Sequence, residues 1–477
     1  MSNNSNKIPQ EFQAAFTAIQ EKMQAAKCSD LSLRAFSNSF EKLANGDTGT
    51  ITDLEIQPVS SLPRLGDLQE YADAGKRAAC KVAILNLNGG LGTGMGLDKA
   101  KSLLPVKNKL SFLEILARQI IDLRQKLNFN IPFILMNSFN TDSDSLMLLE
   151  SLKELVDGQD EIPFSFLQNK VPKLKQSNLH PAKYSEDPSA EWCPPGHGDI
   201  YSCLNDSGIL DSLLAKGYEY AFISNSDNLG ATFDERIVGY LSNNNISFLM
   251  EVANRTPADR KGGHLARNSS GNLILRERAQ CPKESLKDFE DIKKFAYFNT
   301  NSLWINLNSL KDALNKHEGY LDLPLIINSK TINPADSGSE KVFQLETAMG
   351  AAISTFPDAV ALEVPRTRFA PVKTTNDLLE LWSDNFELTD NFTIQRTVER
   401  PPVDIQLDPS FYRNLSDFKK SFPSDVPNLL KCESLVVKGN VIFSENIILE
   451  GDVEIVNHSD QAKVLEGNKT YTGKISL

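Results

Sequence analysis

The sequence predicts an α/β protein built on a largely parallel sheet and ending in a short parallel β-helix. Between residues 81 and 307, short apolar runs alternate with amphipathic segments, as strands and crossover helices do in parallel sheets. In residues 435–457, apolar side chains instead recur every six positions. The 477 residues suit about three domains, and a hydrophobic share of 40% is ample for a large core.

The first expected unit, residues 1–80, is a helical segment followed by a connector. Residues 11–46 are expected to be helical because their apolar side chains have the spacing of one helix face. The residues that set this spacing are Phe12, Phe16, Ile19 and Met23. Residues 47–80 are punctuated by proline and glycine, and we expect a connector rich in turns.

The second expected unit, residues 81–405, holds the sheet. Its first run, KVAILNLNGG, is apolar and ends abruptly in glycine, as a buried parallel strand does where it meets a phosphate-binding loop. Further strands are expected at 131–138, 163–168, 218–228, 246–254 and 302–307, with helices at 111–127 and 143–156. Parallel sheets bind ligands at the carboxyl ends of their strands, so the motifs that follow these strands are candidates for a site.

The third expected unit, residues 406–477, begins with a linker and packing segment at 407–430. Two registers of apolar residues then repeat every six positions. They are Val437, Phe443, Leu449 and Ile455 in one, and Val441, Ile447 and Val453 in the other; Gly439 and Gly451 lie at twice that interval. A six-residue period favours a parallel β-helix. The alternative is a pair of ordinary hairpin strands, whose period of two also satisfies a period of six.

The overall charge excludes several classes of function. Lys and Arg total 50 against 62 Asp and Glu, so the net charge is −12 and sequence-independent binding to nucleic acid is not expected. No apolar run reaches the roughly 18 residues of a membrane span, and the polar N-terminus lacks the core of a signal peptide. Six cysteines without a CxxC pair and five isolated histidines disfavour a zinc site. A cytoplasmic protein with reduced thiols is the expectation.

The most informative motif is NLNGGLGTGMGLDKAKSLLPV at residues 86–106. Closely spaced glycines after a strand let the backbone approach a ligand and direct N–H groups toward phosphate oxygens. Lys101 and Lys107 add positive charge. The spacing fits neither the Walker A loop nor the dinucleotide GxGxxG pattern, which would need a third glycine at Met95. A glycine-rich turn without a ligand is the alternative.

This loop resembles that of the UDP-glucose pyrophosphorylase family. Gly94 replaces the arginine of the wider GGxGTR pattern, as in the UDP-glucose branch, while Ala100 replaces its proline. Similar motifs follow in order at 135–141, 194–199, 222–231, 261–263, 298–307, 344–353 and 364–379. The resemblance implies a Rossmann-like, GT-A-like nucleotidyltransferase domain with a mixed, mainly parallel sheet and a left-handed β-helix at the C-terminus. It also implies synthesis of UDP-glucose and pyrophosphate from UTP and glucose 1-phosphate, assisted by Mg²⁺.

The resemblance assigns UTP contacts to several positions. The backbone of Leu87, Asn88, Gly89 and Gly90, together with Gln168, would hold uridine. An amide suits uracil, whose edge offers a donor and an acceptor. Lys101 would hold the triphosphate and share the catalytic role with Lys373, and Gly196 and Asp227 would complete the UTP site.

Two motifs are also suggestive on physical grounds. In PPGHGD, Gly196 and Gly198 permit a close backbone approach, and His197 can donate to a phosphate or a sugar hydroxyl. In FISNSDNLG, Asp227 follows a strand and offers Mg²⁺ the oxygen ligand that this cation prefers. An Asx-turn or a helix cap is the alternative for the second motif.

The motif VPRTRFAPVKTT places Arg366, Arg368 and Lys373 just before an expected helix, which Thr374 or Thr375 could cap. Basic groups beside a helix N-terminus favour an anion, although most short basic clusters are solvated loops. The resemblance gives Lys373 a contact with the reacting phosphates. We interpret the two arginines as structural or supporting residues.

For the sugar phosphate, the resemblance suggests His197 and a set of amides, acids and glycines. These candidates are Asn225, Gly262, Gly263, Glu277, Asn299 and Asn301. His264 stands where a threonine is expected after KGG, which leaves the details of this pocket open. Three alternatives to a strict glucose enzyme are considered: a broad UDP-sugar pyrophosphorylase, a UDP-N-acetylhexosamine enzyme, disfavoured by Gly94, and a non-catalytic nucleotide-binding regulator. The C-terminal segment is a candidate surface for homo-oligomers.

Overall fold

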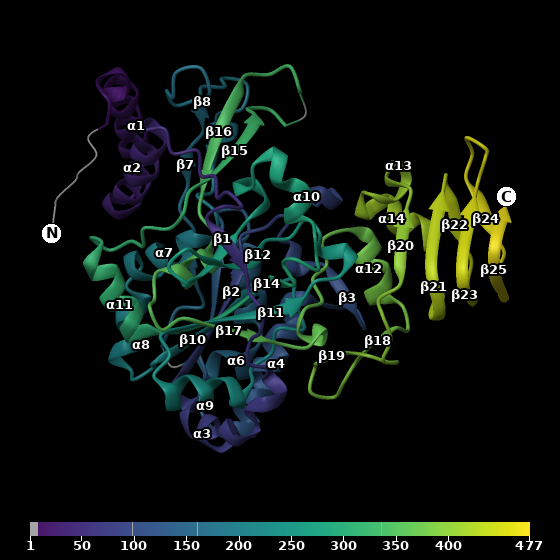
Figure 1. Ribbon diagram of the computed structural model, residues 1–477. Helices are drawn as coiled ribbons and strands as arrows, with labels where there is room; N and C mark the ends of the chain where they lie inside the picture. Colours follow the sequence, from purple (N-terminus) through teal and green to yellow (C-terminus); the bar gives the residue numbers. More distant parts are fainter. Residues whose placement is uncertain (1–7, 98, 160, 335) are drawn as a thin grey trace.

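The structure, a computed structural model, describes residues 8–97, 99–159, 161–334 and 336–477. Its centre is a mixed ten-stranded sheet with helices on both faces (Figure 1). The strand order is β1 (Ile56–Pro58), β12 (His264–Asn268), β14 (Tyr297–Asn306), β10 (Tyr220–Asn225), β2 (Val82–Asn88), β5 (Phe133–Asn137) and β6 (Ser165–Leu167). Branching from it are β11 (Phe248–Asn254), β13 (Leu273–Arg276) and β17 (Val360–Glu363).

The β10–β2–β5–β6 half of this sheet is parallel, as expected. Its register sets Asn225 beside Leu87 and Asn88 beside Asn137, so the carboxyl ends of three strands lie in line. β14 runs antiparallel to both β10 and β11, which makes the sheet mixed.

Apolar residues cover both faces of the sheet because the strand sequences are apolar at consecutive positions. Val82 and Ile84 pack into one buried cluster, with α4 (Phe112–Leu127), α9 (Glu235–Asn244) and α12 (Thr375–Trp382). Ala83 and Leu85 pack into the other, with α7 (Ile200–Asp206), α8 (Ile209–Ala215) and α11 (Leu307–Lys316). The sheet edge that carries the candidate motifs is therefore supported from both sides.

The first 80 residues differ from the expectation in two respects. The helical segment is two helices, α1 (Gln13–Ala25) and α2 (Asp30–Ala44), separated by a turn in which Lys27 has a φ of 57°. The connector contains strand β1 and helix α3 (Ala72–Ala78). Strand β1 pairs with the edge of β12, which lies more than 200 positions later in the chain. Because a strand is stabilised by its partner, the local sequence of β1 carries no signal of this pairing.

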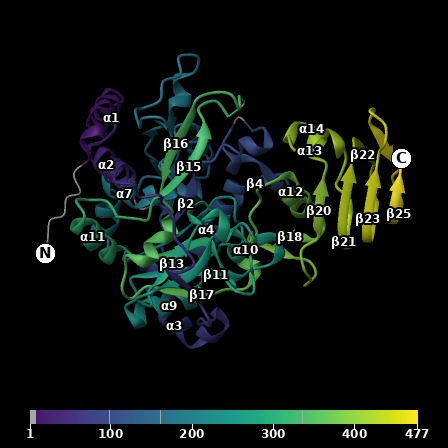
Figure 2. The same cartoon turned by 45° about the horizontal axis from the view of Figure 1, so that its top comes forward.

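The helix expected at 143–156 is likewise divided, into α5 (Asp142–Glu150) and α6 (Lys153–Asp157). A separate three-stranded sheet projects beside α1 and α2 (Figure 2). Its strands are β15 (Ile326–Thr331), β16 (Lys341–Glu346) and β8 (Leu174–Lys175). The remaining short elements are β3 (Pro105–Lys107), β4 (Leu110–Ser111), β7 (Val171–Pro172), β9 (Trp192–Cys193), α10 (Leu286–Phe289), β18 (Phe386–Leu388) and β19 (Ile394–Arg396).

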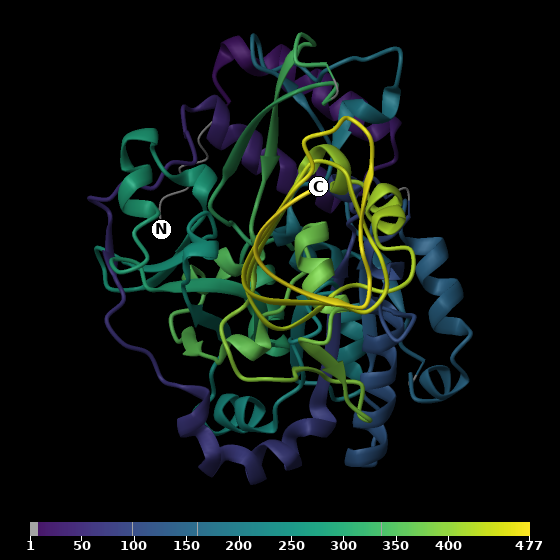
Figure 3. The same ribbon diagram turned by 90° about the vertical axis from the view of Figure 1, so that its right-hand side faces the viewer.

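The C-terminal segment stacks parallel strands, so the hairpin alternative is wrong. Viewed end-on, the chain winds in superimposed loops (Figure 3). One sheet holds β20 (Asp404–Leu407), β21 (Asn428–Lys438), β23 (Ile447–Val456) and β25 (Lys469–Ser476), and the other β22 (Val441–Phe443) and β24 (Lys463–Leu465). All seven residues of the two six-residue registers are buried, and Gly439 and Gly451 have positive φ values that suit glycine.

The expected linker contains two short helices, α13 (Pro409–Tyr412) and α14 (Leu415–Ser421), which lie between the central sheet and the C-terminal strands (Figure 1). Their buried residues belong to the same apolar cluster as one face of the central sheet. Among the described residues, no helix is both long and apolar enough to cross a membrane.

Candidate active site

The glycine-rich loop begins at the carboxyl end of β2, where Asn88 is the last residue of the strand. The Asn88 side chain is buried, and its amide donates to Asn137 Oδ1 at 2.7 Å and to Ser145 Oγ at 2.9 Å. Its oxygen accepts a bond from Ser226 Oγ at 3.1 Å. This side chain therefore ties strand ends together, and Asn88 can meet a ligand only through its backbone.

Within the loop, Gly92 and Gly96 have φ values of 67° and 70°, a conformation that side chains disfavour. The Lys101 N–H donates to the Gly90 carbonyl at 3.0 Å and closes the loop. Space does not require glycine at Gly90 or Gly94, because an added Cβ would meet no atom within 4 Å at either position.

Lys101 and Asp227, predicted separately from two motifs, meet in the structure. Lys101 Nζ lies 2.5 Å from Asp227 Oδ2, and both side chains are about four-fifths buried or more, at 15% and 21% exposed. The same ammonium donates to the Val372 carbonyl, next to Lys373 in the chain. The Lys101 ammonium thus contacts both the Asp227 carboxylate and the segment that carries Lys373.

Gln168 joins the glycine-rich loop to the PPGHGD loop. Its Nε2 donates to the Gly196 carbonyl at 3.0 Å, and its Oε1 lies 3.1 Å from where a Cβ on Gly89 would stand. Gly196 itself has a φ of 83°, and a Cβ there would come within 2.4 Å of the Thr347 carbonyl. Three of the positions predicted to bind UTP therefore converge, and glycine is required at Gly196 both sterically and conformationally.

His197 is held as a neutral hydrogen-bond donor. Its Nδ1 accepts a bond from the Met349 N–H at 3.0 Å, so the ring proton of the neutral imidazole lies on Nε2. Burial lowers the pKa of His197 to about 4, which keeps the ring neutral near pH 7. Met349 belongs to the QLETAMG motif. The residue types of this motif give no sign that it supports His197.

The sugar-side candidates form a second group at the ends of β12, β13 and β14. A Cβ on Gly263 would lie 2.6 Å from the Glu277 carboxylate, so this glycine makes room for the acid. Asn299 donates from its backbone N–H to the Gly263 carbonyl at 3.1 Å and from its side chain to Asn301 Oδ1 at 2.7 Å. Burial raises the pKa of Glu277, and the positive charge of Lys373 opposes that rise. Lys373 is therefore near enough to Glu277 for its charge to act on that carboxylate.

His264 does not belong to this group. It pairs with Arg276 across β12 and β13, and alternation along the strands directs its ring to the face opposite that of Gly263 and Glu277. The ring is fully buried and stacks on Phe295 with ring centres 3.9 Å apart. His264, in place of the expected threonine, thus changes the buried packing on the other face of the sheet and not the sugar-side group itself.

Lys373 is exposed and immediately precedes Thr374, the N-cap residue of α12. Thr374, and not Thr375, caps this helix: its N–H and hydroxyl both donate to Asp377 Oδ2, at 2.7 and 3.0 Å. The Lys373 N–H donates to the same carboxylate at 2.8 Å. The backbone at Lys373 is therefore fixed, while its side chain forms no ion pair with the described residues.

Asp227 is a suitable ligand for a divalent cation carried by a nucleotide. The described residues contain no group of three or more His, Cys, Asp or Glu side chains arranged to hold a metal by themselves. Mg²⁺ bound through one carboxylate takes its other ligands from phosphates and water. The donor set at Asp227 fits that mode of binding, with Lys101 as its present cationic partner.

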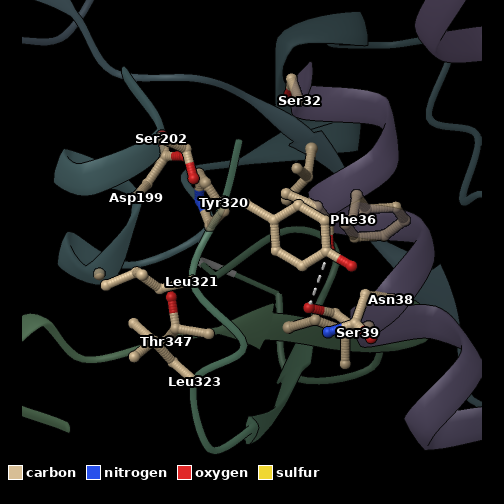
Figure 4. Close-up of a pocket in the computed structure, with 15 residues that line it drawn as sticks. Ser32, Phe36, Asn38, Ser39, Asp199, Ser202, Tyr320, Leu321, Leu323 and Thr347 are labelled. Carbon is tan, nitrogen blue, oxygen red and sulfur yellow. Dashed lines mark hydrogen bonds between the residues drawn. The ribbon is translucent and has the colours of Figure 1, made fainter. Parts of the chain in front are cut away.

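A small cavity lies behind the PPGHGD loop (Figure 4). It has a volume of about 40 Å³ and is lined from α2 by Ser32 and Phe36, and from the loop side by Asp199 and Thr347. Ligand pockets for molecules of nucleotide size measure hundreds of cubic ångströms, so this cavity has room only for water. The candidate site is the open face at the strand ends.

The chain is similar to known proteins over most of its length. The sequence profile of the UTP–glucose-1-phosphate uridylyltransferase family matches residues 33–450. The UTP–glucose-1-phosphate uridylyltransferase of Musa acuminata is 38% identical over 455 residues, which cover 94% of each chain. A probable enzyme of the same name from Schizosaccharomyces pombe is 41% identical over 407 residues, 83% of this chain and 78% of its own.

Solved structures match over almost the whole chain. A point mutant of UDP-glucose pyrophosphorylase from Leishmania major, in complex with UDP-glucose, has 42% identity and a TM-score of 0.92, covering 98% of this chain and 99% of its own. The Trypanosoma brucei protein has 43% identity and a TM-score of 0.89, covering 98% and 100%. On its sequence, its fold and its ordered motifs, the chain belongs to the UTP–glucose-1-phosphate uridylyltransferase family.

Proposed function

We propose that this protein makes UDP-glucose and pyrophosphate from UTP and glucose 1-phosphate. The observation that carries the proposal is the meeting of Lys101, Asp227 and the Lys373 segment at one point of a family fold. A regulator that had lost catalysis would have no need to keep both lysines and the carboxylate. Family membership supports the choice of substrates.

In this proposal the uridine lies against the backbone of Leu87 to Gly90, beside Gln168. The contact between Gln168 and Gly196 leaves the glutamine oxygen directed toward Gly89, where an acceptor can read the uracil N–H. Lys101 exchanges its bond to Asp227 for the triphosphate. The Asp227 carboxylate would be the protein ligand of Mg²⁺, and the bound cation would neutralise phosphate charge.

The sugar phosphate enters on the other side of Asp227. The neutral His197 donates from Nε2 to the incoming phosphate or to a hydroxyl. Asn225 lies at the end of β10 in register with Leu87, between the two groups of residues. Glu277 and Asn299, with Gly263 between them, offer acceptors and an amide to the hydroxyls of glucose.

The reaction joins a phosphate oxygen of glucose 1-phosphate to the α-phosphorus of UTP as the bond to the β-phosphate oxygen breaks. Pyrophosphate carries away the electron pair of that bond. The protein supplies no covalent intermediate; it holds two anions in line and stabilises charge on the α-phosphate, mainly through Lys101 and Lys373. Positioning of these two cations is therefore the main requirement on the fold.

The test is pyrophosphate release from UTP and Mg²⁺, with glucose 1-phosphate and galactose 1-phosphate assayed in parallel. Release with glucose 1-phosphate alone supports the proposal. Comparable release with both sugars would replace it with a broad UDP-sugar pyrophosphorylase. UTP binding without release from either sugar would replace it with the non-catalytic regulator.

Four finer points belong to the same proposal. The C-terminal strands form a left-handed parallel β-helix, a form that their parallel pairing and six-residue period support. This segment offers a surface for homo-oligomers, and the chain divides into units at 1–80, 81–405 and 406–477. The protein acts in the cytoplasm, as its six cysteines without a CxxC pair suggest.

A further inference from the structure

The segment between β17 and α12 carries Lys373 but has little regular structure of its own. Its described elements are a single 3-10 turn, Arg366–Arg368, and an isolated antiparallel bridge between Pro371 and Asn228. In a flexible segment the Lys373 ammonium would have no fixed position. A displacement of about 1 Å can lower the rate of a reaction about a hundredfold. Contacts from outside the segment must therefore fix its path.

Arg368 provides a buried, charged contact of this kind. Its Nε and Nη2 donate to the two carboxylate oxygens of Glu251, each at 2.7 Å, in a bidentate pair. Glu251 is fully buried on β11, and its Oε1 also accepts a bond from Trp304 Nε1 at 2.8 Å. Arg368 Nη2 further donates to the Thr232 carbonyl at 2.7 Å.

The backbone around Arg368 rests on the loop that carries Asp227. Asn228 donates to the Arg368 carbonyl at 3.2 Å and accepts from the Ala370 N–H at 2.9 Å. Gly230 permits the close approach, because a Cβ there would lie 2.5 Å from the Thr367 carbonyl. The segment with Lys373 and the loop with Asp227 are therefore one packed unit, and Arg368 fastens that unit to the sheet.

We propose that Arg368, through its buried pair with Glu251, is a positioning residue that sets the place of Lys373 in the reaction. Arg368 itself touches no reacting atom in this proposal and acts only through the segment it holds. The inference rests on the role proposed above for Lys373.

Stability alone is a weak reason for this arrangement. Removing two charges from water costs several kcal/mol per ion, and apolar replacements of buried ion pairs are often as stable. A guanidinium does provide what an apolar side chain cannot, because its planar fork fixes direction as well as distance. Here the fork satisfies both oxygens of Glu251 and the Thr232 carbonyl at once.

The test is a double-mutant cycle on turnover. Arg368→Lys keeps the charge but loses the fork, and we expect kcat to fall about tenfold or more while the KM values for both substrates change little. In a Lys373→Ala background, the same Arg368→Lys change should lower kcat by less than about twofold, because its effect passes through Lys373. Circular dichroism and thermal unfolding verify that each variant is folded.

Arg124→Lys is the matched control. Arg124 is also a buried arginine, bonded to the carbonyls of Ile131 and Leu155, but it lies at the amino end of β5, away from the strand ends that carry the site. We expect it to lower the unfolding temperature and leave kcat unchanged. If instead the effects of Arg368→Lys and Lys373→Ala on kcat multiply, or Arg368→Lys leaves kcat unchanged, the positioning role is wrong. If Lys373→Ala alone keeps normal turnover, the role proposed for Lys373 fails first.

Discussion

The Lys101 ammonium lies 2.5 Å from a carboxylate oxygen of Asp227, although 126 positions separate the two residues in the chain. The same ammonium bonds to the carbonyl of Val372, so the residue before Lys373 is fixed at the same point. The charges of Lys101 and Asp227 are thus paired with each other. In the proposed function, substrate phosphates replace the carboxylate as the partner of Lys101, and this exchange would let a mainly acidic protein hold a polyanion at one place.

Lys373→Ala is expected to lower kcat about 10²–10³-fold, because it removes a charge that stabilises the transition state. Folding should be unaffected, since the Lys373 side chain is exposed and its backbone is held by Asp377. Steady-state pyrophosphate release measures the change, with unfolding temperature as the check on structure. Turnover within about threefold of normal would remove Lys373 from the reaction.

Lys101→Met is expected to weaken UTP binding and to lower kcat, because Lys101 is proposed both to hold the triphosphate of bound UTP and to stabilise the charge that develops in the transition state. The loss of ground-state binding appears in KM, and the loss of transition-state stabilisation appears in kcat. Isothermal titration of UTP into the variant measures the binding. An unchanged affinity for UTP would mean that the lysine serves only to pair with Asp227.

Gly263→Ala is expected to raise KM for glucose 1-phosphate several-fold while leaving UTP affinity near normal. The added Cβ would lie 2.6 Å from the Glu277 carboxylate and must displace it from the sugar-side group. Gly66→Ala is the control, because a Cβ there meets no atom within 4 Å. Equal increases in the KM values for both substrates would show that Glu277 is not specific to the sugar.

His264 is expected to make the folded protein sensitive to acid. Burial lowers the pKa of His264 to about 3, and the nearby Arg255 and Arg276 oppose protonation further, whereas Asp53 favours it. In the unfolded chain the pKa returns to about 6.5, so between pH 6.5 and about 4 the unfolded state binds more protons. The free energy of unfolding therefore falls as pH falls through this window, by about 1.4 kcal/mol per pH unit for each such histidine.

His197 contributes a second loss of the same sign, since its pKa is lowered to about 4. His264→Phe, which keeps the ring packing between Phe289 and Phe295, should reduce the slope by about 1 kcal/mol per pH unit between pH 6 and 5. Urea unfolding at several pH values measures the slope. Parallel curves for the variant and the parent protein would contradict the buried, neutral state of His264.

Much of the fold could be predicted because its signals are local. Apolar runs marked the strands of the parallel half of the sheet, and the six-residue registers marked the C-terminal strands, whose seven residues are all buried. The helix breaks after Ala25 and Glu150 were missed, because apolar periodicity continues across both turns and reports the buried face of a helix more strongly than its ends. Strand β1 was missed because its partner lies far away in the chain.

For the candidate site, the sequence by itself determined which residue types follow the strands. The apolar periodicity locates the strand ends, and the motifs show the glycines, amides and carboxylates that stand there. Only the tertiary structure decided which of them meet. The contact of Lys101 with Asp227, the support of His197 by Met349 and the pairing of Arg368 with Glu251 each join distant segments. Local sequence encodes propensity and burial, whereas these contacts depend on strand order and register, which the packing of the whole chain fixes.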